Sequence, residues 1–101
     1  MTEEELAAHH EAARNAPVAD WIALGEEMGK EDALAAVVTM TLKGQRAARK
    51  LGAQTVRRRV RNLRHASISE DRISAWLDAH TSAYVRQLAE IPRKSSQPLE
   101  I

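Results

Sequence analysis

The amino-acid sequence predicts an all-α fold, a small bundle of four to five helices. Alanine, glutamate, arginine and leucine dominate the chain, and all four residue types have high helix propensity. No stretch alternates apolar and polar residues for long enough to indicate a β-strand. Residues that begin and end helices also punctuate the chain. Its 101 residues suffice for one helical domain, which we expect over residues 1–91.

The first two helices are predicted from the residues at their ends. Thr2 and Glu5 have the spacing of a capping box, and they open a first helix that runs to about Asn15. Pro17 suits the first turn of a second helix, and Gly29 is expected to end it. Four apolar residues of this second helix share one face: Val18, Trp21, Ile22 and Met28.

The middle segment, residues 31–66, fits either one long helix or two shorter ones. At about 100° per residue, the apolar residues fall into two clusters. The first cluster consists of Leu34, Val37, Thr41, Ala48 and Leu51. The second consists of Val56, Val60 and Leu63. Because the second cluster is rotated from the first by roughly 90 to 100°, two helices with separate inner faces are favoured.

Two glycines lie in this middle segment. Gly52 falls between the two clusters, so we expect the break there, with Gly44 simply tolerated inside a helix. The alternative is a stripe of small residues for a close helix crossing, formed by Gly44, Ala48 and Gly52 at intervals of four.

A last helix is predicted to begin at a second capping box, formed by Ser67 and Glu70. Its apolar residues recur at helical spacing: Ile73, Trp76, Leu77, Tyr84, Leu88 and Ile91. Pro92 cannot continue a helix and is expected to end it. Residues 92–101 are then predicted to form a flexible C-terminal tail.

The predicted core is thin, because the chain has two tryptophans, one tyrosine and no phenylalanine, and much of its apolar content is alanine. A homodimer that shares the apolar surface of two such domains is therefore expected. The residues assigned to the core and the dimer contact are Trp21, Ile22, Trp76, Leu77, Tyr84 and Leu88.

Charge is strongly segregated along the chain, although the net charge is only +1. Residues 33–69 contain nine Lys or Arg and no Asp or Glu, whereas residues 1–32 contain nine acidic and two basic residues. A solvated helix face usually mixes both signs in neighbouring pairs. The basic segment 33–69 therefore predicts a polyanionic partner, either nucleic acid or an acidic protein surface.

Part of this segment resembles a known motif. Residues 46–52 read Arg-Ala-Ala-Arg-Lys-Leu-Gly, and residues 55–63 read Thr-Val-Arg-Arg-Arg-Val-Arg-Asn-Leu. Together, residues 46–64 resemble the helix-turn-helix of Fis-like and LysR-like bacterial transcription regulators. The resemblance implies a turn at Gly52 and a recognition helix whose DNA-facing residues would be Thr55, Arg57, Arg58 and Arg61. The turn is two residues shorter than is usual in those families, which also allows a continuous or kinked helix.

Several classes of function are not expected. The chain has no cysteine, so it forms no disulfide and no thiolate metal site. Its acidic start and short apolar runs predict a cytoplasmic protein without a signal peptide or membrane contact. The adjacent His9 and His10 would diverge by about 100° on a helix and cannot share a metal ion. His80 is expected to be a partly buried structural histidine, and no catalytic residue, metal or cofactor is predicted.

The sequence therefore predicts a small non-enzymatic regulatory protein of bacterial or phage type. It is expected to bind nucleic acid, with DNA as the first choice. The expected contact residues are Lys43, Arg46, Lys50, Gln54, Thr55, Arg57, Arg58, Arg61 and Arg64. The alternative is an inhibitor or antiactivator that docks on a transcription regulator or a nucleoprotein complex. Two other interpretations are possible from the sequence. The protein could be a scaffold component, or the basic face could serve only solubility or be neutralised by acidic residues of the same chain. The acidic residues considered for that neutralisation are Glu3, Glu4, Glu5, Glu26 and Glu27.

Overall fold

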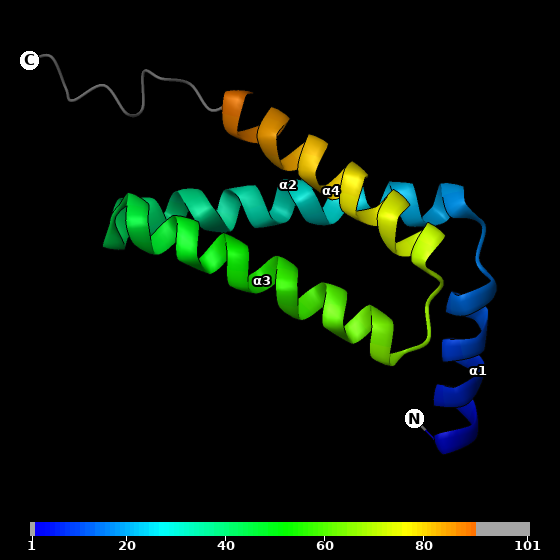
Figure 1. Cartoon of the computed structure of the whole chain (residues 1–101). Helices are drawn as coiled ribbons and strands as arrows, with labels where there is room; N and C mark the ends of the chain where they lie inside the picture. Colours follow the sequence, from blue (N-terminus) through cyan, green and yellow to red (C-terminus); the bar gives the residue numbers. More distant parts are fainter. Residues whose placement is uncertain (1, 91–101) are drawn as a thin grey trace, which may run out of the picture.

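The structure is a computed structural model, and it describes residues 2–90. The described residues form four helices and no strand, which confirms the all-α prediction. The helices are α1 (Glu3–Asn15), α2 (Val18–Lys43), α3 (Gln45–His65) and α4 (Glu70–Glu90). Figure 1 shows α2, α3 and α4 as an elongated bundle, which α1 leaves steeply at the end opposite the α2–α3 turn. Ile91, the helix end predicted at Pro92 and the predicted C-terminal tail lie outside the described residues.

Helix α1 begins and ends as predicted. The Thr2 hydroxyl accepts a hydrogen bond from the backbone N–H of Glu5 at 3.1 Å, and α1 ends at Asn15. No residue of α1 is buried. The indole N–H of Trp21 donates to the Ala13 carbonyl at 3.3 Å, so the anchored part of α1 is its last turn.

Helix α2 does not end at Gly29, and that prediction is wrong. The helix continues to Lys43 because Gly29 and Gly25 are buried against α4. A Cβ atom at Gly25 would overlap the Trp76 carbonyl oxygen, and one at Gly29 would overlap the His80 carbonyl oxygen. The two glycines therefore let the backbones of α2 and α4 approach closely, a role that a sequence cannot distinguish from a helix end.

The break in the middle segment lies at Gly44, and the prediction of a break at Gly52 is wrong. Gly44 has φ +94°, a conformation that side chains disfavour, and α2 ends there while α3 begins. Gly52 lies inside the continuous helix α3, where a Cβ atom would sit 3.3 Å from the Tyr84 hydroxyl oxygen. The predicted inner cluster assumed one helical phase from Leu34 to Leu51. Because the turn at Gly44 puts these residues on two helices with separate inner faces, the cluster does not form, and both leucines are exposed.

The connection between α3 and α4 ends one helix and caps the next. Ser67 adopts a left-handed conformation with φ 62°, and its N–H bonds the Arg64 carbonyl. The N–H of Ile68 bonds the Leu63 carbonyl, which completes a Schellman-type helix end. The predicted capping box at Ser67 is therefore wrong; the Ser69 hydroxyl caps α4 by accepting from the N–H of Arg72 at 3.3 Å.

The larger apolar side chains collect at the α1 end of the bundle. Trp21, Ile68, Ile73 and Trp76 form a buried cluster there. Towards the α2–α3 turn, the contact between α2 and α4 is made by small buried residues such as Ala33, Ala36 and Ala83. This half of the bundle is thin, so polar residues also take part in holding it together. None of the four helices in residues 2–90 has the length and apolar character of a membrane span.

Candidate nucleic-acid interface

Helix α3 carries eight of the nine basic residues of segment 33–69 and no acidic residue. Its inner face is set by the buried Ala48 and the half-buried Val56, Val60 and Leu63. Because a helix advances about 100° per residue, residues spaced alternately by three and four share one face. The outer face, opposite Ala48, therefore holds one line of polar residues, called here the outer stripe: Arg46, Lys50, Gln54, Arg57, Arg61 and Arg64.

All side chains of the outer stripe are exposed. Eighteen residues separate its first and last members, so at 1.5 Å per residue the stripe is about 27 Å long. Figure 1 shows α2 and α4 on one side of α3 and no described helix on the opposite side. The stripe therefore presents a straight row of cationic groups to solvent.

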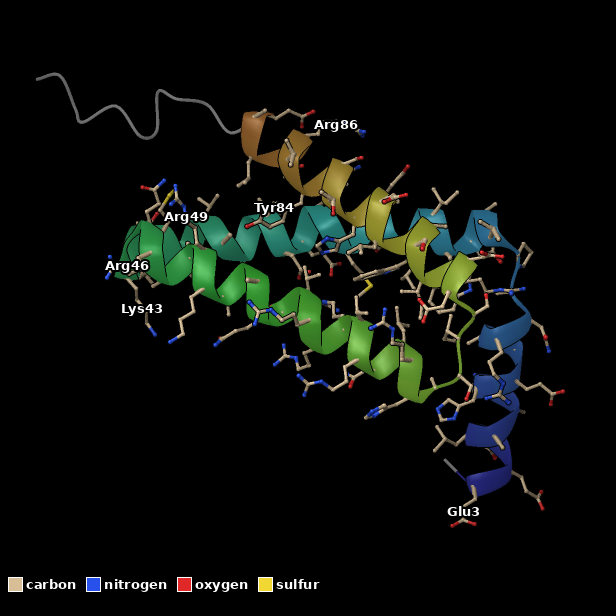
Figure 2. All side chains as sticks on the ribbon, in the orientation of Figure 1. Glu3, Lys43, Arg46, Arg49, Tyr84 and Arg86 are labelled. Atoms are coloured by element: carbon tan, nitrogen blue, oxygen red, sulfur yellow. The ribbon has the colours of Figure 1, made fainter. Side chains whose placement is uncertain are left out.

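Little of this charge is neutralised within the described residues. Arg64 forms an exposed ion pair with Glu70 at 3.1 Å, and the other bases of the outer stripe form none among residues 2–90. Figure 2 shows Lys43 and Arg46 where α2 turns into α3, whereas Glu3 lies at the free end of α1 at the other end of the molecule. None of the five glutamates considered for neutralisation pairs with a basic residue in this part of the chain.

The remaining predicted contact residues lie beside the stripe. Lys43 is exposed at the α2–α3 turn, and Arg58 is exposed on one flank of α3. Thr55 is half-buried on the inner side, where it lines a cavity with Tyr84. The structure therefore brings six of the nine predicted residues into one line and separates Thr55 from them.

Arg59 was not among the predicted contact residues, and it faces inward. Its Nη2 bonds Asp32 Oδ1 at 2.9 Å, and Asp32 Oδ2 lies 2.8 Å from His80 Nε2. The Asp32 carboxylate thus links α2, α3 and α4 in the thin half of the bundle. The available signal was the phase of Arg59, which places it between Ala48 and Leu63, but no sequence pattern pairs it with Asp32.

His80 is more deeply buried than expected, with 2% of its surface exposed. Its ring lies between those of Trp76 and Tyr84, with centroid distances of 5.0 and 6.1 Å. Burial raises the pKa of Tyr84 above its ordinary value of 10.0, and the negative charge of Asp32 adds to this. The Tyr84 phenol is therefore protonated at neutral pH. No group of three His, Asp or Glu side chains that could hold a metal ion occurs among residues 2–90.

The residues predicted for the core and the dimer contact fall into a buried group and an exposed group. Trp21 and Trp76 are buried in the chain's own core, and Leu77 packs against it. Ile22 and Leu88 are exposed, with 40% and 38% of their surfaces accessible, and Tyr84 is half-buried. A dimer contact through these residues stays a prediction.

The fold and site define a small all-helical protein with one cationic helix face. No protein-family model, curated protein or solved structure matches the chain. The resemblance of residues 46–64 to a helix-turn-helix stays a prediction, but the turn it implies at Gly52 is replaced by a continuous helix. Function must therefore be inferred from the charge and geometry of α3.

Proposed function

We propose that this protein is a small non-enzymatic regulator that binds nucleic acid through the outer stripe of α3. The observation that carries the proposal is the row of exposed bases on a helix without acidic residues. Four of them, Arg46, Lys50, Arg57 and Arg61, form no ion pair among residues 2–90. Phosphate contacts of this kind provide most of the affinity of nonspecific nucleic-acid binding.

Duplex DNA is the nucleic acid that fits this face best. A helix with its side chains is about 10–12 Å across, and the major groove of B-DNA is about 12 Å wide. The major groove of A-form RNA is too narrow to admit side chains in this way. Arginine can contact phosphate or guanine in a bidentate manner, which suits the three arginines at the α4-proximal end of the stripe: Arg57, Arg61 and Arg64.

The test is fluorescence anisotropy of a labelled duplex across a salt series. The Arg57→Gln/Arg61→Gln variant removes two charges from the outer stripe. The Lys30→Gln/Arg86→Gln variant removes the same charge from exposed positions on α2 and α4. The slope of log affinity against log salt is expected to fall by about 0.9 for each lost contact in the first variant only. Equal losses in both variants would show that only net charge matters and would exclude the proposed interface.

A second function is favoured by the continuity of α3. Without a turn at Gly52, α3 has no preceding helix of the helix-turn-helix kind to orient it on DNA. An acidic surface on a transcription regulator or nucleoprotein complex would contact the same bases, and the protein would then act as an inhibitor or antiactivator. This alternative predicts that duplex binding is lost near physiological salt, while binding to an acidic partner persists and requires Arg57 and Arg61.

A further inference from the structure

A cavity of about 520 Å³ lies between α2, α3 and α4. This volume is within the range of about 300–1,000 Å³ that is typical of small-molecule sites. Its walls are mainly apolar, and they include Ala35, Ala36, Leu51, Gly52, Ala53 and Val56. The cavity is open to solvent on one side, since Ala35, Leu51 and Ala53 are exposed, and it can hold the apolar body of a small ligand against three helices.

The cavity wall also contains polar groups that have no partner among residues 2–90. Arg49 of α3 and Tyr84 of α4, both labelled in Figure 2, line this cavity and a smaller adjoining one of about 160 Å³. Arg49 forms no ion pair among residues 2–90. The Tyr84 hydroxyl takes part in none of the hydrogen bonds found in the same part of the chain. Because this phenol stays protonated at neutral pH, its hydroxyl can donate a hydrogen bond.

The charge of the cavity favours an anion. Asp32 is the one carboxylate in its lining, and both of its oxygens are already used by Arg59 and His80. The charges of the lining that form no ion pair within residues 2–90 are the guanidinium groups of Arg49 and Arg57. Arg57 also belongs to the outer stripe, whereas Arg49 lies outside the stripe and lines the adjoining cavity together with Tyr84. Arg49 is therefore the cation that shares both cavities with the Tyr84 hydroxyl.

We propose that this cavity binds a small molecule with an apolar body and one carboxylate or similar acidic group. The apolar body lies against Ala35, Ala36 and Val56, and the anion contacts Arg49 and the Tyr84 hydroxyl. This ligand site goes beyond nucleic-acid binding: Arg57 lies at both sites, but the two groups that contact the anion, Arg49 and Tyr84, do not belong to the outer stripe. It can therefore be present or absent independently of the proposed function.

The test is a titration of the ¹⁵N-labelled protein with octanoate, followed by amide NMR, with 1-octanol as the uncharged probe of matched length. Octanoate is expected to shift the amide signals of Gly52, Thr55 and Thr81, which line the cavity. Arg49→Gln is expected to weaken octanoate binding by about tenfold, the usual effect of losing a charge-assisted contact, and 1-octanol binding by much less. Arg58→Gln, an exposed arginine on the same helix that does not line the cavity, should leave both affinities unchanged.

A second pair of variants tests the apolar part of the site. Ala35→Leu places extra side-chain volume in the cavity, whereas Ala23→Leu adds the same volume at an exposed position of α2 outside it. Only Ala35→Leu is expected to reduce the binding of both probes. Octanoate shifts confined to the exposed apolar residues Leu34 and Val38 would overturn the proposal. Equal effects of Arg49→Gln and Arg58→Gln would also overturn it.

Discussion

Asp32 is the residue on which the thin half of the bundle most depends. Its carboxylate bonds Arg59 of α3 and His80 of α4, while the apolar core lies at the other end of the molecule. A charge that loses its only partner in a buried setting is strongly destabilising. The side chain of Arg59 is 30% exposed, so water relieves part of that effect.

We therefore predict that Asp32→Asn lowers the free energy of unfolding by about 2–3 kcal/mol. Urea denaturation measures this as a lower midpoint with an unchanged slope. Asp78→Asn, which neutralises an exposed carboxylate on α4, serves as the control and should change stability by less than about 0.5 kcal/mol. Similar effects of the two variants would mean that the Asp32 cluster contributes no stability of its own.

Because of Tyr84, the free energy of unfolding is expected to fall at alkaline pH. The pKa of Tyr84 is raised in the folded protein by burial and then by Asp32, so the folded state holds its proton more tightly than the unfolded state does. The stabilisation is fully present below pH 10.0, the ordinary pKa, and is lost as the pH rises from there through the raised pKa.

The chain contains one tyrosine, so the absorbance of the ionised phenol reports the pKa of Tyr84 alone. Asp32→Asn should lower this pKa only partly, because burial is the larger cause. Tyr84→Phe should remove the corresponding loss of stability above pH 10.0. A titration midpoint at the ordinary value in the folded protein would contradict the packing of this side chain.

At the scale of the helices, the four glycines have different roles, and the crossing of α2 over α4 depends on two of them. Gly25 and Gly29 lie against backbone carbonyl oxygens of α4, which cannot move without moving the helix. Gly52 lies against the end of the Tyr84 side chain, which can shift. Alanine is also favoured over glycine inside a helix by about 1 kcal/mol.

Gly29→Ala is therefore predicted to destabilise the protein by about 1–3 kcal/mol, because the added methyl group forces α2 and α4 apart. Gly52→Ala is the matched substitution, and it should leave the free energy of unfolding within about 1 kcal/mol of the wild-type value. Thermal unfolding of the two variants compares them directly. An equal loss at both positions would be incompatible with a close crossing at Gly29.

These glycines also explain which features could be predicted from the sequence. The N-cap at Thr2, the end of α1 and the helical nature of the chain follow from local preferences, and they agree with the structure. The ends assigned to Gly29 and Gly52 were wrong because a helix-ending glycine and a helix-packing glycine look alike in sequence. The distinction depends on α4, which lies far along the chain.

The sequence indicated the exposed bases of the candidate interface but not their single line. Each base could be placed off the apolar cluster from helical phase alone, whereas the expected break at Gly52 would have put Arg46 and Lys50 on a separate helix from the other members of the outer stripe. The Asp32–Arg59–His80 cluster joins three helices, and no local pattern pairs its members.

At the scale of the whole molecule, residues 2–90 expose apolar side chains that no other part of this range covers. Leu34, Val38 and Leu42 are spaced by four along the outer side of α2, and they are 52%, 57% and 75% exposed. The thin core and this uncovered surface both favour the homodimer predicted from composition.

Light scattering is expected to give twice the 11.2 kDa of one chain, and Val38→Asp should shift the mass towards that of the monomer. Leu6→Asp places the same charge on an exposed apolar residue of α1 and should leave the dimer intact. A monomeric wild-type protein at high concentration would refute the dimer. It would not affect the proposed interface on α3.

Acidic and basic residues also occupy different parts of the molecule. The acidic first turn of α1 and the basic α3 lie apart, and Arg64 with Glu70 is the ion pair that joins the outer stripe to an acidic residue within residues 2–90. The cationic surface is thus available to a partner, and its orientation is set by the inner face of α3.

The most direct test of the interface is a scan in which each basic residue of α3 is changed to Gln and the affinity for a DNA duplex is measured at one salt concentration. The losses are expected to follow the helical phase: largest at Arg46, Lys50, Arg57 and Arg61, smaller at the Glu70-paired Arg64, and least at Arg49 and the inward-facing Arg59. Equal losses at every position, or none at the outer stripe, would contradict nucleic-acid binding through this face of α3.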